Sequence, residues 1–148
     1  RYVHDIHAAE DIAIDAFSDL VVNKHRYNFK VTLKTYLFML GRSRALNYIK
    51  RRKLIDFVAL SEAENVSSEL EALEEIVLKD EKKRVVNNAL ASLPDDMRVV
   101  IHLIYFEDMS YDEAGRVMKK SRKQVDNLLY RAKKELRIIL GKDGELLL

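Results

Sequence analysis

The chain of 148 residues contains no cysteine, only one proline and only four glycines. Without cysteine it can form neither disulfides nor reactive thiolates, which favours a reducing, cytoplasmic compartment. The scarcity of proline and glycine and the lack of alternating β-branched runs favour an all-α protein. No apolar run approaches membrane-spanning length and no signal peptide is visible, so we expect no membrane insertion. Because the chain begins at Arg1, we expect further residues before it.

Patterns that carry catalysis or hold a metal are also missing. The four histidines have no accompanying pattern of carboxylates or cysteines, so no metal site is predicted. The sequence shows neither a nucleophile–base set nor a glycine loop that could cradle phosphate. We therefore expect a binding protein without a cofactor, and not an enzyme.

The net charge of +2 conceals a segregation of charge along the chain. Residues 1–53 carry eleven Lys/Arg and five Asp/Glu, residues 54–80 carry one and eight, and residues 81–148 carry fourteen and eleven. Two basic blocks with an acidic connector indicate two nucleic-acid contacts. The pattern predicts two small helical domains, at 1–53 and 68–148, joined by an acidic linker at 54–67.

Two capping boxes lie close together in the C-terminal block. Ser110 with Glu113, and Ser121 with Gln124, have the S-x-x-E/Q spacing that opens a helix. This interval fits a short helix, a tight turn and a second helix, which is helix-turn-helix spacing. Gly115, in the first of these helices, provides a position where the second could cross closely.

The second of these helices has two contrasting faces. A stripe at steps of three and four is expected to be buried: Val125, Leu129, Ala132, Leu136 and Ile139. The opposite face carries Gln124, Asn127, Arg131 and Lys134, flanked by Lys123 and Tyr130. Amide and guanidinium groups on one exposed face can read adenine and guanine edges. The alternative is an amphipathic helix whose polar face meets only water.

The N-terminal block begins with a predicted helix at Ala8–Val22. Its expected inward face comprises Ala9, Ile12, Ala13, Ala16, Phe17 and Leu20. Aspartates recur on another face at positions 11, 15 and 19. Such a stripe cannot face phosphates, so it is either solvated surface or a site for a basic protein partner.

Cations alternate with aromatic residues in the segment Lys24–Lys30. Such a segment suits unpaired bases, because cations hold phosphates and rings stack on bases. The alternative is a connecting loop whose Tyr27 and Phe29 enter the core. A long helix is expected at Val31–Lys53, and it ends in four consecutive cations. Four exceed what the helix dipole needs at its C-terminus, which indicates contact with phosphates.

Helix signals also precede the helix-turn-helix. Ser68 and Glu71 form another capping box, and helical sequence continues to Leu90. The lone proline, Pro94, and the carboxylates of Asp95 and Asp96 mark the first turn of the next helix.

Two stretches in this order resemble extracytoplasmic-function (ECF) bacterial sigma factors. "AEDIAIDAF" followed by "LKTYLFMLGRSRALNYIKRRK" resembles sigma region 2, and "LPDDMRVVIHLIYFEDMSYDEAGRVMKKSRKQVDNLLYRAKKEL" resembles region 4. Together they cover about half the chain, and the acidic stretch falls where the family has its linker. Ser43 and Lys119–Lys120 depart from the residues common there.

The resemblance implies a role for each site. The helix with Asp11, Ile14, Asp15 and Phe17 would dock on the clamp helices of the largest subunit of core RNA polymerase. Region 2 would select and melt the −10 element through Lys24, Arg26, Tyr27, Phe29, Tyr36, Ser43, Asn47, Lys50 and Arg51. Region 4 would bind the −35 element through Arg122, Lys123, Gln124, Asn127, Tyr130, Arg131, Lys133 and Lys134. Promoter DNA, core polymerase and an anti-sigma factor are the implied partners.

Two other functional hypotheses are compatible with the sequence. An autonomous helix-turn-helix regulator would leave the aspartate stripe and the second basic block unexplained. A protein-interaction module that binds polymerase or a regulator without reading DNA is the rival from another class.

Overall fold

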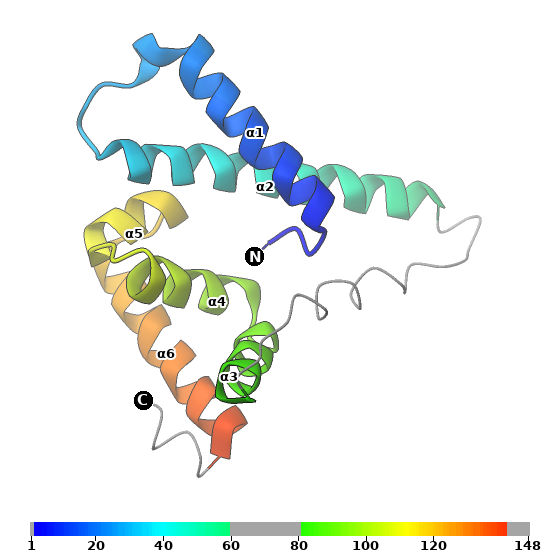
Figure 1. The fold of residues 1–148 in the computed structure, drawn as a ribbon, viewed down its shortest axis with the longest axis vertical. Coiled ribbons are helices and arrows are strands. Elements are labelled where there is room, and N and C mark those ends of the chain that lie inside the picture. Colours follow the sequence, from blue (N-terminus) through cyan, green and yellow to red (C-terminus); the bar gives the residue numbers. More distant parts are fainter. Residues whose placement is uncertain (1, 60–80, 142–148) are drawn as a thin grey trace. The chain divides into compact units, whose positions relative to one another are not determined.

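The computed structural model describes residues 2–59 and 81–141, which divide between two compact units, Tyr2–Ile76 and Val77–Leu148 (Figure 1). The regular structure in these described residues is helical, without strands, as the composition predicts. None of the described helices is long and apolar enough to cross a membrane.

The first unit is a helical hairpin of α1 (Ile6–Val22) and α2 (Leu33–Ala59), with the 3₁₀ turn η1 (Lys24–Arg26) between them. The start of α1 is set by Asp5, whose carboxylate accepts hydrogen bonds from the backbone N–H groups of His7 and Ala8. This cap places the helix start before the predicted Ala8. At α2, the hydroxyl of Thr32 accepts from the backbone N–H of Thr35 in the same manner.

The two helices of the hairpin bury a narrow seam. Ala16 of α1 and Ala45 of α2 are buried, and Ile12 and Leu20 are half-buried. The predicted inward face of α1 is wrong at three positions that are exposed: Ala9, Ala13 and Phe17. Its apolar stripe is wider than the strip that a single partner helix can cover.

Helix α2 does not end at its run of cations. It continues past the predicted end at Lys53 to Ala59. The predicted linker at 54–67 is therefore wrong for its first residues, which are helical. The rest of that linker, and the capping box at Ser68 and Glu71, lie outside the described residues.

The second unit contains α3 (Glu81–Ala91), α4 (Asp95–Ile101), the π-helical turn η2 (His102–Phe106), α5 (Tyr111–Met118) and α6 (Arg122–Leu140). Helix α6 packs against α3, α4 and α5. The largest fully buried side chains of this core are Val100, Leu103, Met118, Val125 and Leu129. Helix α6 is thus held by three other helices of the unit.

A buried arginine fixes the corner between α3 and α4. Arg98 is 5% exposed, donates to the carbonyl oxygen of Ala91 at 2.9 Å and pairs with the carboxylate of Asp95. Asp95 and Asp96 lie in the first turn of α4, as predicted, whereas Pro94 stands one residue earlier than predicted, at the N-cap position. The π-helical turn that follows is closed by a hydrogen bond from Glu107 N to His102 O at 3.1 Å.

Candidate nucleic-acid interface

The helix-turn-helix of α5 and α6 is opened by two reciprocal capping boxes. The Ser110 hydroxyl accepts from Glu113 N at 3.1 Å, and the Glu113 carboxylate accepts from Ser110 N at 3.0 Å. At α6, the Ser121 hydroxyl accepts from Gln124 N at 3.2 Å, while Gln124 Oε1 accepts from Ser121 N at 2.8 Å. Both predicted helix starts are confirmed.

The turn between these helices requires a glycine. Lys120 N donates to Gly115 O at 2.8 Å, which folds the turn back onto α5. A Cβ atom at Gly115 would lie only 2.5 Å from the carbonyl oxygen of Lys120. Lys119, at the C-cap, takes up the reversal in the left-handed region with φ 54°. The need for a position without a side chain at Gly115 is therefore confirmed, but the turn backbone makes the close approach, whereas Val125 of α6 would lie 3.6 Å away, an ordinary contact distance.

The buried stripe of α6 matches the prediction except at its end. Val125, Leu129, Ala132 and Leu136 are buried, but Ile139 is 44% exposed. It lies in the last turn of α6, where the covering of the stripe by neighbouring helices ends. Leu128, which was not predicted, is buried as well.

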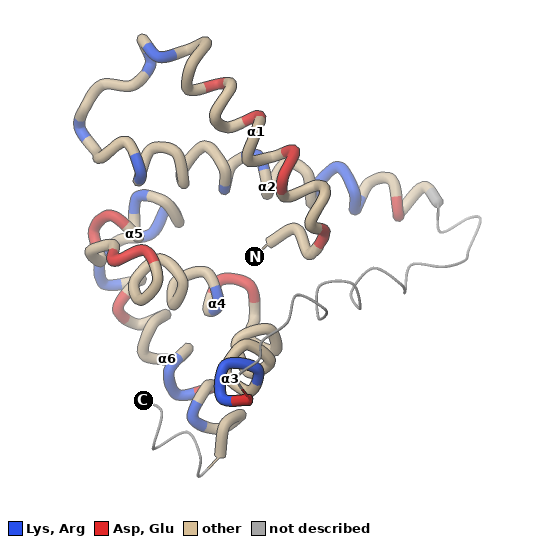
Figure 2. Tube along the Cα trace, viewed as in Figure 1, with Lys and Arg blue, Asp and Glu red and all other residues tan. Residues whose placement is uncertain are grey.

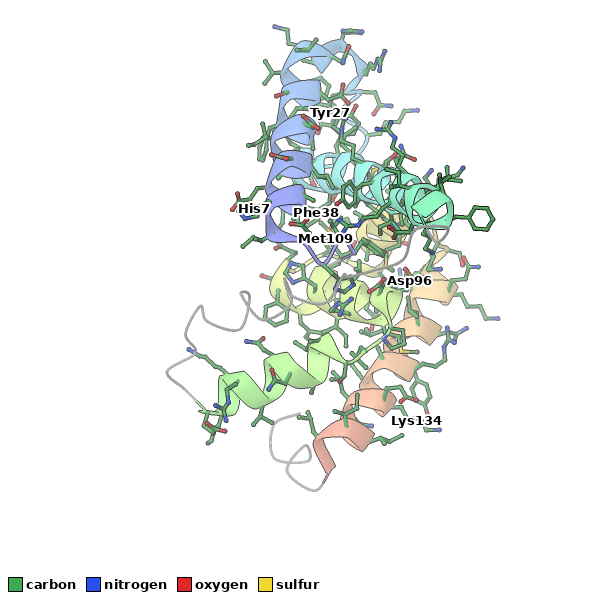
Figure 3. The ribbon with its side chains drawn as sticks, turned by 90° about the vertical axis from the view of Figure 1, so that its right-hand side faces the viewer. His7, Tyr27, Phe38, Asp96, Met109 and Lys134 are labelled. Carbon is green, nitrogen blue, oxygen red and sulfur yellow. The ribbon has the colours of Figure 1, made fainter. Side chains whose placement is uncertain are left out.

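The opposite face of α6 is open. The side chains predicted to read or hold DNA there are exposed: Lys123, Gln124, Asn127, Tyr130, Arg131 and Lys134. Figure 3 labels Lys134, which projects outward from the body of the unit. The structure therefore gathers amide, phenol and cationic groups on one helical face, the arrangement that readout in a major groove requires.

Three of the predicted residues have contacts that the sequence did not reveal. Gln124 uses its carbonyl oxygen in the capping box, so its amide N–H₂ is the group left to contact DNA. The ammonium of the half-buried Lys133 lies 5.2 Å from the centre of the Tyr105 ring. Arg122 pairs with Asp112 of α5 at 3.5 Å. Lys133 and Arg122 thus face neighbouring elements of the same unit.

In the first unit, an aromatic cluster shapes the loop between η1 and α2. The hydroxyl of half-buried Tyr27 donates to Val31 O at 2.5 Å, and its ring lies 4.7 Å from Phe29 and 5.1 Å from Tyr36. Phe29 is 84% exposed and has a left-handed backbone, φ 61°. Tyr27 therefore anchors the loop, whereas the alternative that Phe29 enters the core is wrong.

The cations and polar groups predicted to contact the unpaired strand of the −10 element lie on the outside of the hairpin. Exposed positions include Lys24, Arg26, Ser43, Asn47, Lys50 and Arg51, while Tyr36 is half-buried. Figure 2 shows the Lys/Arg run in the second half of α2 as a blue segment. One member of the run, Arg52, pairs with Asp5 at the N-cap of α1 at 3.9 Å and donates to Tyr48 Oη of its own helix at 2.9 Å.

The aspartate stripe of α1 divides into two parts. Asp19 accepts from Asn23 Nδ2 at 2.5 Å and pairs with Arg44 of α2 at 3.1 Å. The hydrogen bond from Asn23 and the Arg44 guanidinium lower the pKa of the Asp19 carboxyl. Asp11 and Asp15 are exposed, and no ion pair joins either to another described residue.

Exposed apolar side chains accompany the two open aspartates. Ile14 is 63% exposed and Phe17 is 56% exposed. The four residues predicted to bind polymerase are thus all exposed on α1, two of them acidic and two apolar. Among the described residues, no cluster of histidine and carboxylate groups could hold a metal ion.

Sequence comparison finds relatives for both the second unit and nearly the whole chain. Residues 83–136 match the family model "Sigma-70, region 4". The ECF RNA polymerase sigma factor SigM of Bacillus subtilis is 26% identical over 138 residues, covering 93% of this chain and 83% of SigM. SigW of the same organism is 27% identical, covering 93% of this chain and 78% of SigW. The RNA polymerase sigma-H factor of Pseudomonas aeruginosa is 26% identical, with 92% and 75% covered.

The fold has a counterpart among solved structures. The sigma factor RpoE of Bartonella quintana, crystallised with the anti-sigma factor NepR, matches with a TM-score of 0.75. The match covers 96% of this chain and 86% of RpoE at 19% sequence identity. It therefore establishes likeness of fold.

Proposed function

The chain belongs to the extracytoplasmic-function group of bacterial RNA polymerase sigma factors, and on that premise we propose how its two units divide promoter recognition. A sigma factor directs core RNA polymerase to promoters. The second unit, with its helix-turn-helix, reads the −35 element, and the first unit reads and melts the −10 element. The first working domain extends to Ala59, the end of α2, and residues 68–148 are the second, with the acidic sequence between them as the connection.

The observation that carries this assignment is the open polar face of α6 within the region 4 match. Asn127 and Arg131 lie one helical turn apart on that face, so both can reach neighbouring base pairs in one groove. Lys123, Tyr130 and Lys134 flank them and suit phosphate contacts. Gln124 contributes its amide N–H₂, while Arg122 and Lys133 reach phosphates only if their present partners release them.

The −10 strand is assigned to the outer surface of the hairpin. Phe29 stands exposed on a loop held by Tyr27, where it can stack on an unpaired base. Lys24 and Arg26, exposed in the preceding turn η1, supply phosphate-binding cations. Along α2, the strand path comprises Tyr36, Ser43, Asn47, Lys50 and Arg51. An exposed ring among cations is better suited to single-stranded than to duplex DNA.

Core polymerase is assigned to the surface of Asp11, Ile14, Asp15 and Phe17. Its carboxylates repel DNA phosphates and attract a basic protein surface, while Ile14 and Phe17 supply apolar area. We assign the clamp helices of the largest subunit as the partner. The protein works in the cytoplasm, where polymerase acts, and leaves the chemistry to the polymerase.

An anti-sigma factor is the remaining proposed partner. Its support is the match to RpoE, which was crystallised with the anti-sigma factor NepR. Such a partner would withhold the chain from polymerase until a signal arrives.

The experiment that tests the assignment measures binding to duplex promoter DNA with and without core polymerase. We expect sequence-selective binding only when polymerase is present. Selective binding by the free chain would favour an autonomous regulator, and polymerase binding without selectivity would favour a protein-interaction module.

A further inference from the structure

At the start of α6, a carboxylate from the preceding helix engages one of the cations assigned to DNA phosphates. Arg122 is the first residue of α6, and its Nη1 lies 3.5 Å from Oδ2 of Asp112 in α5. The side chains are 71% and 62% exposed, so water surrounds the pair. Exposed pairs of this kind add little to folding stability, which leaves their effect on charged ligands as their main consequence.

The adjoining turn repeats this arrangement. Lys120 pairs with Asp96 of α4 at 3.9 Å. The segment 119–123 carries four cations, and carboxylates of α4 and α5 pair with two of them. Lys119 and Lys123 are exposed beside these pairs.

We propose that Asp112 restrains the affinity of the helix-turn-helix for DNA by holding Arg122 away from the phosphate backbone. This inference rests on the proposed function, since it concerns the phosphate contacts of the −35 reader. A phosphate that takes Arg122 must displace the Asp112 carboxylate, and the remaining negative charge then repels the phosphate. Phosphate contacts carry no sequence information, so the restraint lowers the affinity for all sequences alike, including the non-specific affinity that rests on such contacts.

The geometry favours competition over cooperation between Asp112 and DNA. Arginine–carboxylate pairs that fix the orientation of the arginine are frequently bidentate, with two parallel hydrogen bonds. Here a single contact at 3.5 Å joins two exposed side chains. Asp112 is therefore a residue that lowers the affinity of the helix-turn-helix for the DNA backbone.

The test is a double-mutant cycle on the full chain. The affinity of each variant for a 30-base-pair duplex of mixed sequence is measured by fluorescence anisotropy over a salt series. Asp112→Asn should bind about 3- to 5-fold more tightly at about 0.1 M salt. The slope of log affinity against log salt should steepen by about 0.9, the value for one more phosphate contact. In the background of Arg122→Gln, Asp112→Asn should change affinity by less than about 1.5-fold.

Asp108→Asn is the matched control. Asp108 is an exposed carboxylate of the same unit with φ 52°, a conformation that asparagine also tolerates. It alters the net charge equally, and we expect no change in the salt slope. Circular dichroism of each variant checks that the helices are intact.

Several results would overturn the inference. Weaker binding by Asp112→Asn would make Asp112 a residue that positions Arg122 for DNA. An equal gain in Asp108→Asn, or an undiminished gain without Arg122, would reduce the effect to general charge. No gain at all, including no measurable binding by either protein, would also contradict it. The proposed function is tested separately, by promoter binding and transcription with polymerase. A negative result for Asp112 therefore does not count against the proposed function.

Discussion

At the scale of single residues, Arg131 and Lys134 are expected to have different roles on the same face of α6. A bidentate contact from arginine to a base edge is worth about 1–3 kcal/mol of discrimination, whereas a phosphate contact carries none. Arg131→Ala should therefore relax preference at one or two adjacent base pairs of the −35 element. Lys134→Ala should weaken all sequences alike and lower the salt slope by about one.

The measurement is binding of polymerase reconstituted with each variant to a panel of single-base-pair variants of the −35 element. Both side chains are exposed, so circular dichroism should show an intact fold. An equal loss across the panel for Arg131→Ala would make this arginine a phosphate contact. Base reading would then fall to Asn127 and Gln124.

Asp19 gives the first unit a dependence on pH. Its hydrogen bond from Asn23 and its pair with Arg44 lower its pKa in the folded state. The stabilisation is therefore fully present above the unfolded pKa of about 3.9 and is lost as pH falls through the lower folded value. Asp19→Asn should lower the free energy of unfolding at pH 7, with the difference from wild type closing in acid.

Urea unfolding followed by circular dichroism at several pH values measures this difference. Asp15→Asn, an exposed position of the same helix, serves as the control and should leave the free energy of unfolding unchanged. A difference between Asp19→Asn and wild type that persists undiminished in acid would show that the carboxylate charge is not its source.

At the scale of elements, the helix-turn-helix depends on the missing side chain of Gly115. A Cβ there would lie 2.5 Å from the backbone carbonyl oxygen of Lys120, which cannot move without opening the turn. Gly115→Ala should therefore destabilise the second unit by about 1–3 kcal/mol. Gly41 in α2 is the matched control, because nothing lies within 4 Å of its Cβ position.

Gly41→Ala should stabilise the hairpin by about 0.5–1 kcal/mol, since alanine loses less entropy in a helix. Thermal and urea unfolding of the two variants measure both effects. If Gly115→Ala unfolds like wild type, the turn is less tightly closed than the structure indicates.

Elements set by local signals were predictable from the sequence. The starts of α5 and α6 follow from side chains three residues apart, and the stripe of α6 follows from helical periodicity. The pairs Asp112–Arg122 and Lys133–Tyr105 were not predictable, because each joins different elements. The π-helical turn η2, with its i+5→i hydrogen bond, was not predictable either, because neither composition nor residue spacing indicates it.

The first unit was predicted less well for a related reason. Its helices were recognisable, but the buried side of α1 depends on how much of it α2 covers. The end of α2 was placed at Lys53 because the cations suggested a terminus, whereas the helix continues to Ala59. Of the aspartate stripe, only the structure shows that Asp19 serves the hairpin while Asp11 and Asp15 remain open.

At the scale of the whole molecule, the α1 surface should determine association with polymerase independently of DNA binding. Reversing charge at two exposed positions with Asp11→Lys and Asp15→Lys should abolish co-purification with core polymerase. The helix-turn-helix belongs to the other unit, so binding of the chain to duplex DNA should not weaken. Undiminished co-purification would return these aspartates to solvated surface.

The most direct test of the central claim is run-off transcription by core RNA polymerase on a library of promoter fragments. With the wild-type chain, we expect defined transcripts from a subset of fragments that share −35 and −10 sequences. Arg131→Ala should redistribute the transcripts among fragments, and the double aspartate reversal should remove them all. Transcripts that are unchanged by the addition of the chain, or that show no dependence on promoter sequence, would contradict its assignment as a promoter-specificity factor.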